Sequence, residues 1–326
     1  MNPHRNPHRV LVRVPASTAN LGPGFDTIGM ALELYAWIEM AFAEETRIRM
    51  EPDHSAVIPA DKSNVVYRAA QNVFAAAGEH HPELSINIRS DIPLARGLGS
   101  SASAIVGALY AANALIGGKF SDDELFQMAA RMEDHPDNVG ASIFGGIVVA
   151  SWDGERADHI RIEPDPRLEV LLAVPEYHLA TDKARSVLPE RVSLKDAVFN
   201  VSHASLLVAA LCSGNLPMIR RAMKDALHQP YRCPLIPGME TVLREAWRYG
   251  ALGVALSGAG PTLLAFVERG DPVSERLSAF MSETMRGHGA RVEMMRLRPS
   301  AEGVRILTPE DDHSTLFAKI KGDPEG

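Results

Sequence analysis

The stretch IPLARGLGSSASAIVGALYAAN, residues 92–113, places Gly97, Gly99 and two adjacent serines directly before a run of small and apolar residues. The residues before it, over 84–92, alternate between apolar and polar side chains, which predicts a half-buried strand. A glycine-rich turn between a strand and a helix presents backbone N–H groups at the positive end of the helix dipole, where anions bind. The stretch therefore predicts a strand, an anion-binding turn and a helix that begins near Ser101.

The segment after this turn has the pattern of two consecutive helices. Apolar side chains at 105, 108, 109, 112, 115 and 116 follow helical spacing, and the small residues at 107 and 111 leave a smooth opposite face. Gly117 and Gly118 predict the end of this helix. Ser121 with Glu124 three residues later is a capping-box signature and predicts a second helix, which must end before Pro136.

The length of 326 residues and the remaining patterns predict two domains of the α+β class. A polar, proline-containing stretch over 151–167 is the expected junction, so that residues 1–160 and 161–326 form the two domains. The second domain is expected to contain strands over 168–174, at both ends of 253–267 and near 291–297, and helices over 194–212, 238–249 and near 272–286.

The N-terminal region begins with the repeated tetrapeptide NPHRNPHR. It fits a solvated, extended arm better than a histidine metal clip, because proline keeps it extended and nothing with ligand spacing follows. Residues 9–14, RVLVRV, alternate as a strand does. The next segment, PASTANLGPGF over 15–25, is expected to break the strand because of Gly22, Pro23 and Gly24.

Composition excludes several classes of function. Apolar residues make up 46% and charged residues 23%, as in a globular protein, and the formal net charge of −8 argues against a broad nucleic-acid surface. Cys212 and Cys233 are too few for a disulfide framework. No apolar run approaches the eighteen or so residues of a membrane span, and the N-terminus lacks a secretory signal. We therefore expect a cytoplasmic protein without membrane or nucleic-acid partners.

The glycine-rich turn does not match the two best-known phosphate-binding loops. The Walker A motif requires Gly-Lys-Ser/Thr, and no lysine lies between Asp91 and Ile116. The dinucleotide fingerprint requires a third glycine where Ala102 stands. On its own, the turn fits a tight connection with a helix cap better than it fits a phosphate site.

Three motifs together resemble those of the GHMP kinases, the family of galacto-, homoserine, mevalonate and phosphomevalonate kinases. PLARGLGSSAS over 93–103 resembles the second family motif, VPASTANLGPGFD over 14–26 the first, and LSGAGPTLLAF over 256–266 the third. The resemblance implies a ribosomal S5 domain 2-like N-terminal domain that binds ATP and a ferredoxin-like C-terminal domain. It also implies an active site between them and a homodimer.

Further segments are similar to those of the family branch that acts on L-homoserine: HPDNVGASIFGG over 135–146, ATDKAR over 180–185 and QPYRCPLIPG over 229–238. This resemblance implies ATP-dependent phosphorylation of the side-chain hydroxyl of L-homoserine, a step of threonine biosynthesis. Two alternatives stay open, namely a kinase for a mevalonate-like acceptor and a silent nucleotide-binding relative. Ser17 stands where mevalonate-type relatives have lysine, and Glu133 argues against a silent protein.

The resemblance assigns the nucleotide and metal contacts. ATP would be held by the cradle amides and neighbouring residues, which are Asn64, Pro93, Arg96, Gly97, Leu98, Gly99, Ser100, Ser101, Ala102 and Ser103. Ser101 and Glu133 would bind Mg²⁺, which suits one hydroxyl and one carboxylate beside phosphate and water. Two plain alternatives are that Asn64 only caps a helix and that Glu133 is an exposed carboxylate at a helix end.

The resemblance also assigns the substrate contacts. Arg185 and Arg232 would bind the carboxylate of a zwitterion, unless they are surface arginines. Thr181 is expected to cap the helix that carries Arg185 and to touch substrate. The ammonium and hydroxyl groups would lie near Asn20, Asp26 and Asn138, with His135 as a polar neighbour. The expected catalytic set is Asp26, Asn138 and Arg185, although turn formation equally explains Asn20 and Asp26.

One position departs from the pattern of the homoserine branch. Asp134 stands where many of its members have glycine, so that EGHPDN becomes EDHPDN. Glycine is favoured where the backbone adopts a positive φ. The sequence therefore leaves the backbone geometry beside Glu133 open.

Overall fold

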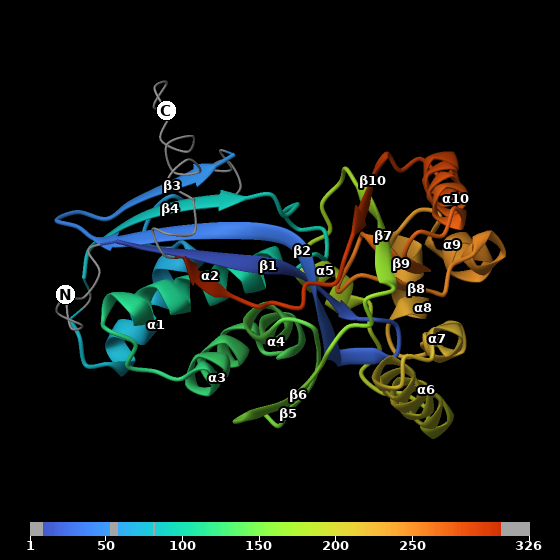
Figure 1. The fold of residues 1–326 in the computed structure, drawn as a ribbon, viewed down its shortest axis with the longest axis horizontal. Coiled ribbons are helices and arrows are strands. Elements are labelled where there is room, and N and C mark those ends of the chain that lie inside the picture. The colour runs from blue at the N-terminus through green and yellow to red at the C-terminus, as the bar shows by residue number, and fades with distance from the viewer. Residues whose placement is uncertain (1–8, 53–57, 81, 308–326) are drawn as a thin grey trace.

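The computed structural model describes residues 9–52, 58–80 and 82–307. Of the NPHRNPHR repeat, residues 2–9, only the last residue, Arg9, lies within these ranges. Two β-sheets, each with its own helices, lie one after the other along the long axis of the molecule (Figure 1). The chain forms six strands of the first sheet before it crosses to the second, and it adds the last strand of the first sheet near residue 305. The mixed helix and sheet architecture confirms the predicted fold class.

The first sheet has seven strands, and its main path runs in the order β11-β1-β2-β4-β3. Off this path, β5 pairs with residues 28–30 of β2, and β6 pairs with β5. The pairing of β3 with β4 is parallel. The strands are β1 (Val10–Asn20), β2 (Gly24–Phe42), β3 (Arg47–Glu51), β4 (Leu84–Ser90), β5 (Ile147–Trp152), β6 (Ala157–Ile162) and β11 (Arg305–Leu307).

Helices α1 (Val65–Ala76), α2 (Ser100–Leu115), α3 (Asp122–Glu133) and α4 (Asp137–Phe144) lie together below this sheet in Figure 1. The small residues on one face of α2 let the helix pack closely against β2. A Cβ on Gly107 would lie only 2.5 Å from Cδ1 of Ile38. Helix α2 ends before Gly117 and Gly118, both at positive φ, and the capping box of α3 is present. These helix boundaries confirm the sequence predictions.

The second sheet has four antiparallel strands in the order β10-β7-β9-β8. The predicted strands are present as β7 (Leu168–Pro175), β8 (Gly253–Leu256), β9 (Leu263–Glu268) and β10 (Val292–Leu297). The predicted helices are α6 (Leu194–Cys212), α9 (Met239–Glu245) with a 3₁₀ turn at Ala246–Tyr249, and α10 (Val273–Gly287). Three further short helices are α5 (Thr181–Ser186), α7 (Leu216–Ala222) and α8 (Gln229–Arg232).

The β1–β2 hairpin connects the two halves. The prediction that residues 15–25 break the strand holds only for 21–23. Residues 15–20 remain in β1, with a register shift on either side of Ala16–Ala19, and β2 begins at Gly24. This segment is buried between the halves, so its backbone polar groups need strand partners. Leu21 and Ile28 pack into one core with Leu264 and Phe266 of the second sheet.

The chain crosses between the sheets twice. The polar stretch over 151–167 begins inside the β5–β6 hairpin, and the chain leaves the first sheet only after Ile162. The chain returns to the first sheet near residue 305, where β11 pairs with β1 and Leu307 aligns with Leu11. The last described strand therefore belongs to the N-terminal sheet, although it lies late in the sequence.

Helix α6 corrects the expectation that no apolar run is long enough for a membrane span. The segment Leu194–Ser213 has a mean hydropathy of 1.3 over 18 residues, and only 22% of that window is buried. Among the described residues, α6 is the one helix that is long and apolar enough to cross a membrane, by length and composition alone.

Candidate active site

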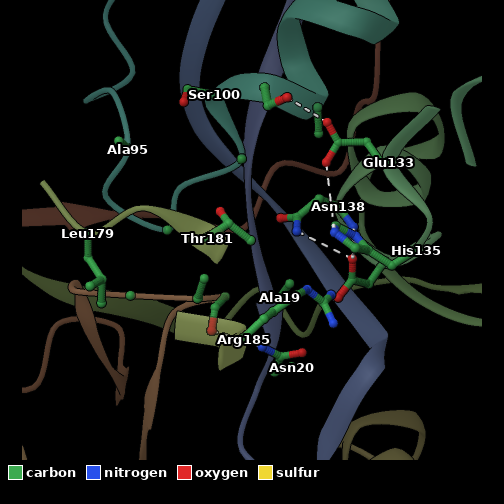
Figure 2. A pocket seen from close by; sticks show the side chains of 18 of the residues that line it. Ala19, Asn20, Ala95, Ser100, Glu133, His135, Asn138, Leu179, Thr181 and Arg185 are labelled. Carbon is green, nitrogen blue, oxygen red and sulfur yellow. Dashed lines mark hydrogen bonds and ion pairs between the residues drawn. The ribbon is translucent and has the colours of Figure 1, made fainter. Parts of the chain in front are cut away.

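A cavity of about 380 Å³ lies where the two halves meet. It is lined by the end of β1, the 94–99 loop, the beginnings of α2, α4 and α5, the end of α3, and the loop between β8 and β9. Figure 2 shows Ser100 at one end and Arg185 at the other, with Glu133 and His135 along the wall between them. All three glycine-containing motifs therefore contribute to one cavity.

Gly97 and Gly99 are required by close contacts between these motifs. Their φ angles are 75° and 68°, a region that favours glycine. A Cβ on Gly97 would lie 2.1 Å from the carbonyl oxygen of Ser257, and one on Gly99 would lie 2.0 Å from Oγ of Ser17. The Ser257 hydroxyl also donates to the Gly97 carbonyl at 2.6 Å. The two glycines thus hold the second motif against the first and third.

The N-terminus of α2 opens into the cavity. Gly99 is its N-cap, and within the described chain no side chain caps the helix. Ser100, Ser101 and Ala102 of the first turn line the cavity. N–H groups of a first helical turn have no partner within the helix and attract anions. This end of the cavity is therefore suited to bind phosphate.

Ser101 and Glu133 lie side by side, as the family resemblance implied for these two residues. The Ser101 hydroxyl donates to Oε1 of Glu133 at 2.5 Å. Glu133 is the last residue of α3, and its side chain is 14% exposed, so it is not an ordinary surface carboxylate. Asp134 follows at a φ of 61°, which explains why glycine suits this position and how aspartate, which tolerates that region, can replace it.

His135 lies between two carboxylates. Its Nδ1 is 3.1 Å from Oδ1 of Asp137, and its Nε2 is 3.9 Å from Oε2 of Glu133. Burial favours the neutral imidazole, but the hydrogen bond to Asp137 and the charges of Asp137 and Glu133 outweigh it and raise the pKa of His135 above 6.5. His135 therefore connects Glu133 to Asp137, the first residue of α4.

Asp137 is a carboxylate of the cavity wall to which no sequence motif assigned a role. Its side chain is 2% exposed, and it accepts the backbone N–H of Asn138 at 2.6 Å. Asn138 in turn accepts a hydrogen bond from Ser17 at 3.0 Å. The polar run HPDN, residues 135–138, could have pointed to Asp137, because it has no apolar neighbours to cover it. A carboxylate that is buried in such a run needs polar partners.

Asp26 and Arg185 form an ion pair at the other end of the cavity. Asn20 fixes the turn that carries Asp26, since its Oδ1 accepts the Asp26 N–H at 2.9 Å and its Nδ2 donates to the Gly258 carbonyl at 2.9 Å. Asp26 has a φ of 52°. The structure therefore gives Asn20 and Asp26 a role in turn formation, and both also line the cavity.

Arg232 is 1% exposed, so the alternative of a surface arginine is wrong for this residue. Its Nε donates to the Ala184 carbonyl at 3.0 Å, and its Nη1 donates to the Gly258 carbonyl and to Nδ1 of His228. No hydrogen-bond partner for Nη2 occurs among the residues that the structure describes. Burial and then the charge of Arg185 lower the pKa of Arg232 to about 10. Two cations near one cavity favour an anionic ligand between them.

Two sequence-predicted residues have other local roles than expected. Thr181 lines the cavity but does not cap α5, because Ala180 is the N-cap and no side-chain cap is present among the described residues. Arg96 is bonded to three backbone carbonyls, namely those of Leu94, Pro175 and Glu176. Its guanidinium therefore ties the glycine-rich loop to the end of β7, which explains why it does not line the cavity.

Four other residues of the predicted ATP set lie apart from the cavity wall. Asn64 is the N-cap of α1 and accepts the Val66 N–H at 2.9 Å, which agrees with the alternative that it caps a helix. It also lines an adjoining, mainly apolar hollow of about 60 Å³, together with Ser103. Leu98 is buried in the core between the halves, and Pro93 is not among the described residues that line either space.

Two family models match the chain. The model described as the GHMP kinases N terminal domain matches residues 64–146, and the one described as GHMP kinases C terminal matches residues 207–286. Homoserine kinase from Moorella thermoacetica is 43% identical over 297 residues, which cover 91% of this chain and 99% of that protein. Homoserine kinase from Deinococcus radiodurans is 43% identical over 90% of this chain and 96% of that protein.

Solved structures give the same result for the fold. The crystal structure of homoserine kinase from Cytophaga hutchinsonii matches with a TM-score of 0.84 and 26% identity, over 94% of this chain and all of that chain. The structure of L. major mevalonate kinase in complex with R-mevalonate matches with a TM-score of 0.63 at 16% identity, over 90% and 95% of the two chains. The second match concerns the fold alone.

Proposed function

The chain belongs to the homoserine kinases of the GHMP kinase family, and we propose that its cavity binds L-homoserine beside ATP and yields O-phospho-L-homoserine. The observation that carries this proposal is the arrangement of Asp26, Arg185 and Arg232 at one end of the cavity. A zwitterion requires a carboxylate near its ammonium group and cations near its carboxylate. A galactose-like acceptor would need neither.

The opposite end of the cavity would hold the triphosphate of ATP. The uncapped first turn of α2 and the glycine-rich turn supply backbone N–H groups in a protein whose net charge is −8. Because amide dipoles act locally, they can bind an anion without a basic surface. The adjoining hollow beside Asn64, with apolar walls that include Ile38 and Ile88, is the proposed place of the adenine base.

Ser101 and Glu133 would bind Mg²⁺ beside the phosphates. A hydroxyl and a carboxylate oxygen already lie 2.5 Å apart, which is the donor chemistry that Mg²⁺ prefers when phosphate and water complete its shell. No group of three or more His, Cys, Asp or Glu side chains that could hold a metal occurs among the described residues. Bound Mg²⁺ would neutralise charge on the phosphates during transfer.

The remaining residues would orient the acceptor hydroxyl. Phosphoryl transfer depends mainly on positioning and charge neutralisation. We propose that Asn138, held by Ser17, and Asp26, held by Arg185, position homoserine so that its hydroxyl points toward the phosphate end. In this proposal the N-terminal part, residues 1–160, supplies the ATP site, and residues 161–326 supply both arginines.

The proposal also places the enzyme in threonine biosynthesis, in the cytoplasm and as a homodimer, which rests on the family resemblance. Sedimentation velocity would test the dimer. The activity itself is tested by ADP release with Mg-ATP and four acceptors: L-homoserine, mevalonate, galactose and L-threonine. We expect turnover with homoserine to exceed the others by far. Background rates with all four would favour a silent relative, and preference for mevalonate would favour the other alternative.

A further inference from the structure

His228 is a completely buried histidine beside the proposed substrate end of the cavity, yet it does not line the cavity. It is the residue before α8, in the segment LHQPYR that also contains Arg232. Its ring stacks on Phe25 with centroids 5.2 Å apart. A buried imidazole requires polar partners for both of its nitrogens, so these partners indicate what it does.

The partners of His228 determine its tautomer. Nδ1 lies 3.1 Å from Nη1 of Arg232, and an arginine nitrogen can only donate. Nδ1 must therefore be the unprotonated acceptor. Nε2 lies 2.8 Å from the carbonyl oxygen of Gly22, which can only accept, so Nε2 carries the hydrogen. His228 is thus neutral and protonated on Nε2, and burial, which lowers its pKa, favours this form.

The hydrogen bond to His228 fixes the orientation of Arg232 together with two bonds to backbone carbonyls. With Nε on the Ala184 carbonyl and Nη1 on both His228 and the Gly258 carbonyl, the plane of the guanidinium is set on two sides. Nη2 is the terminal nitrogen left without a partner in the described chain. Because a guanidinium is planar and rigid, fixing Nε and Nη1 also fixes where Nη2 can donate.

The same imidazole fixes the turn at Gly22. This turn joins β1 to β2 and carries Asn20 on one side and Asp26 on the other. Asp225 holds His228 in place, because its carboxylate accepts the backbone N–H groups of His228 and Gln229 at 3.0 Å and 2.6 Å. His228 therefore connects the turn that carries Asp26 to Arg232, which lines the same end of the cavity.

We propose that His228 is a positioning residue for substrate specificity: its neutral imidazole holds Arg232 so that Nη2 binds the α-carboxylate of the amino-acid substrate. This inference rests on the proposed function, because it assigns the carboxylate of homoserine to Arg232. It adds that the carboxylate preference depends on a residue that never touches the substrate.

Two substitutions separate the two hydrogen bonds of His228. In His228→Asn, Oδ1 stands at the place of Nδ1 and can accept from Arg232, while the donor to Gly22 is lost. In His228→Gln, the amide Nε2 stands at the place of the ring Nε2 and can donate to Gly22, while the acceptor for Arg232 is lost. The first should keep the KM for homoserine within about threefold, and the second should raise it about tenfold or more. The KM for ATP should stay constant in both.

A carboxylate-free acceptor distinguishes positioning from a general structural role. Homoserinol has a CH₂OH group in place of the carboxylate of homoserine, so it cannot use the contact with Nη2. We expect His228→Gln to leave kcat/KM for homoserinol nearly unchanged relative to wild type. An equal loss with both acceptors, or an equal loss in His228→Asn and His228→Gln with homoserine, would overturn the inference. Wild-type enzyme inactive on homoserine would instead overturn the proposed function.

A spectroscopic measurement on the wild-type chain does not depend on whether these variants fold. The ¹⁵N chemical shifts of the His228 ring, in protein labelled on histidine, report which nitrogen carries the proton. We expect the neutral form protonated on Nε2 at pH 7. A proton on Nδ1 would overturn the inference, because Arg232 would then have no acceptor there.

Discussion

Arg185 and Asp26 are 159 positions apart in the chain and form a two-point ion pair, with Nη1–Oδ2 at 3.0 Å and Nη2–Oδ1 at 2.9 Å. The pair connects α5 of the second half to the β1–β2 hairpin of the first, and both residues line the cavity. Their side chains are 37% and 33% exposed, so a ligand can reach both charges. A zwitterionic amino acid presents the complementary charges.

Asp26→Asn should lower kcat/KM for homoserine by about 10- to 100-fold, because the ammonium group loses its counter-charge and Arg185 loses its partner. The KM for ATP should not change, since Asp26 lies at the far end of the cavity from Ser100. Steady-state kinetics with each substrate varied in turn measures both values. A loss that appears only in the KM for ATP would contradict the assignment of Asp26 to the acceptor.

Arg232→Lys keeps the charge but removes the planar array of donors, so we expect the KM for homoserine to rise about 10-fold or more. The exposed Arg276→Lys on α10 is the matched control, and its kinetics should equal those of wild type. Thermal unfolding of both variants would show whether the buried site tolerates lysine. An unchanged KM in a folded Arg232→Lys protein would remove Arg232 from the substrate site.

Glu133→Gln should reduce turnover by roughly 100-fold or more and raise the Mg²⁺ concentration needed for half-maximal activity, because the proposed ligand loses its charge. Glu240→Gln, at an exposed position of α9, is the control for loss of a carboxylate. Activity is measured across a Mg²⁺ titration, with circular dichroism to verify the fold. Wild-type turnover in Glu133→Gln would exclude this residue as a metal ligand.

Gly97→Ala and Gly99→Ala should destabilise the protein more than Gly78→Ala. All three glycines have φ between 68° and 75°, so a left-handed alanine costs roughly 1–2 kcal/mol at each of them. A Cβ on Gly78 would meet no atom of the described residues within 4 Å, whereas one on Gly97 or Gly99 would meet Ser257 or Ser17 at 2.1 Å and 2.0 Å. We expect an additional ~1–3 kcal/mol at 97 and 99, measured by urea unfolding. Equal losses at all three positions would disprove the close contact.

Asp137→Asn should lower the pKa of His135, which the hydrogen bond and charge of Asp137 now help to raise. A histidine whose folded pKa exceeds its unfolded value contributes stability that is fully present below about pH 6.5 and is lost as the pH rises through the folded pKa. The mutation should therefore weaken this part of the pH dependence of unfolding. NMR titration of the His135 ring gives the pKa directly, and an unchanged value would show that Asp137 does not control it.

The elements that follow from neighbours in the chain were predictable. The capping box of Ser121 and Glu124, the glycine stop after α2, and the strands and longer helices of the second half depend on spacing, caps and turn residues. Each of these signals acts within a few residues, so one sequence contains it in full. The convergence of the three motifs followed from family resemblance, which also predicted that Ser101 and Glu133 lie together.

Burial and long-range contacts decided the rest. Pro15 through Asn20 stay in a strand because the second half of the molecule covers them, and Asn20 forms its turn with Gly258, 238 positions away. Residues that pack against them from distant segments make Arg232 a buried arginine of the cavity wall, Arg96 a loop anchor and Asp137 a cavity carboxylate. The residue type determines which hydrogen bonds a polar side chain can form. Tertiary packing determines which partners lie within reach and which polar atom stays free to bind a ligand.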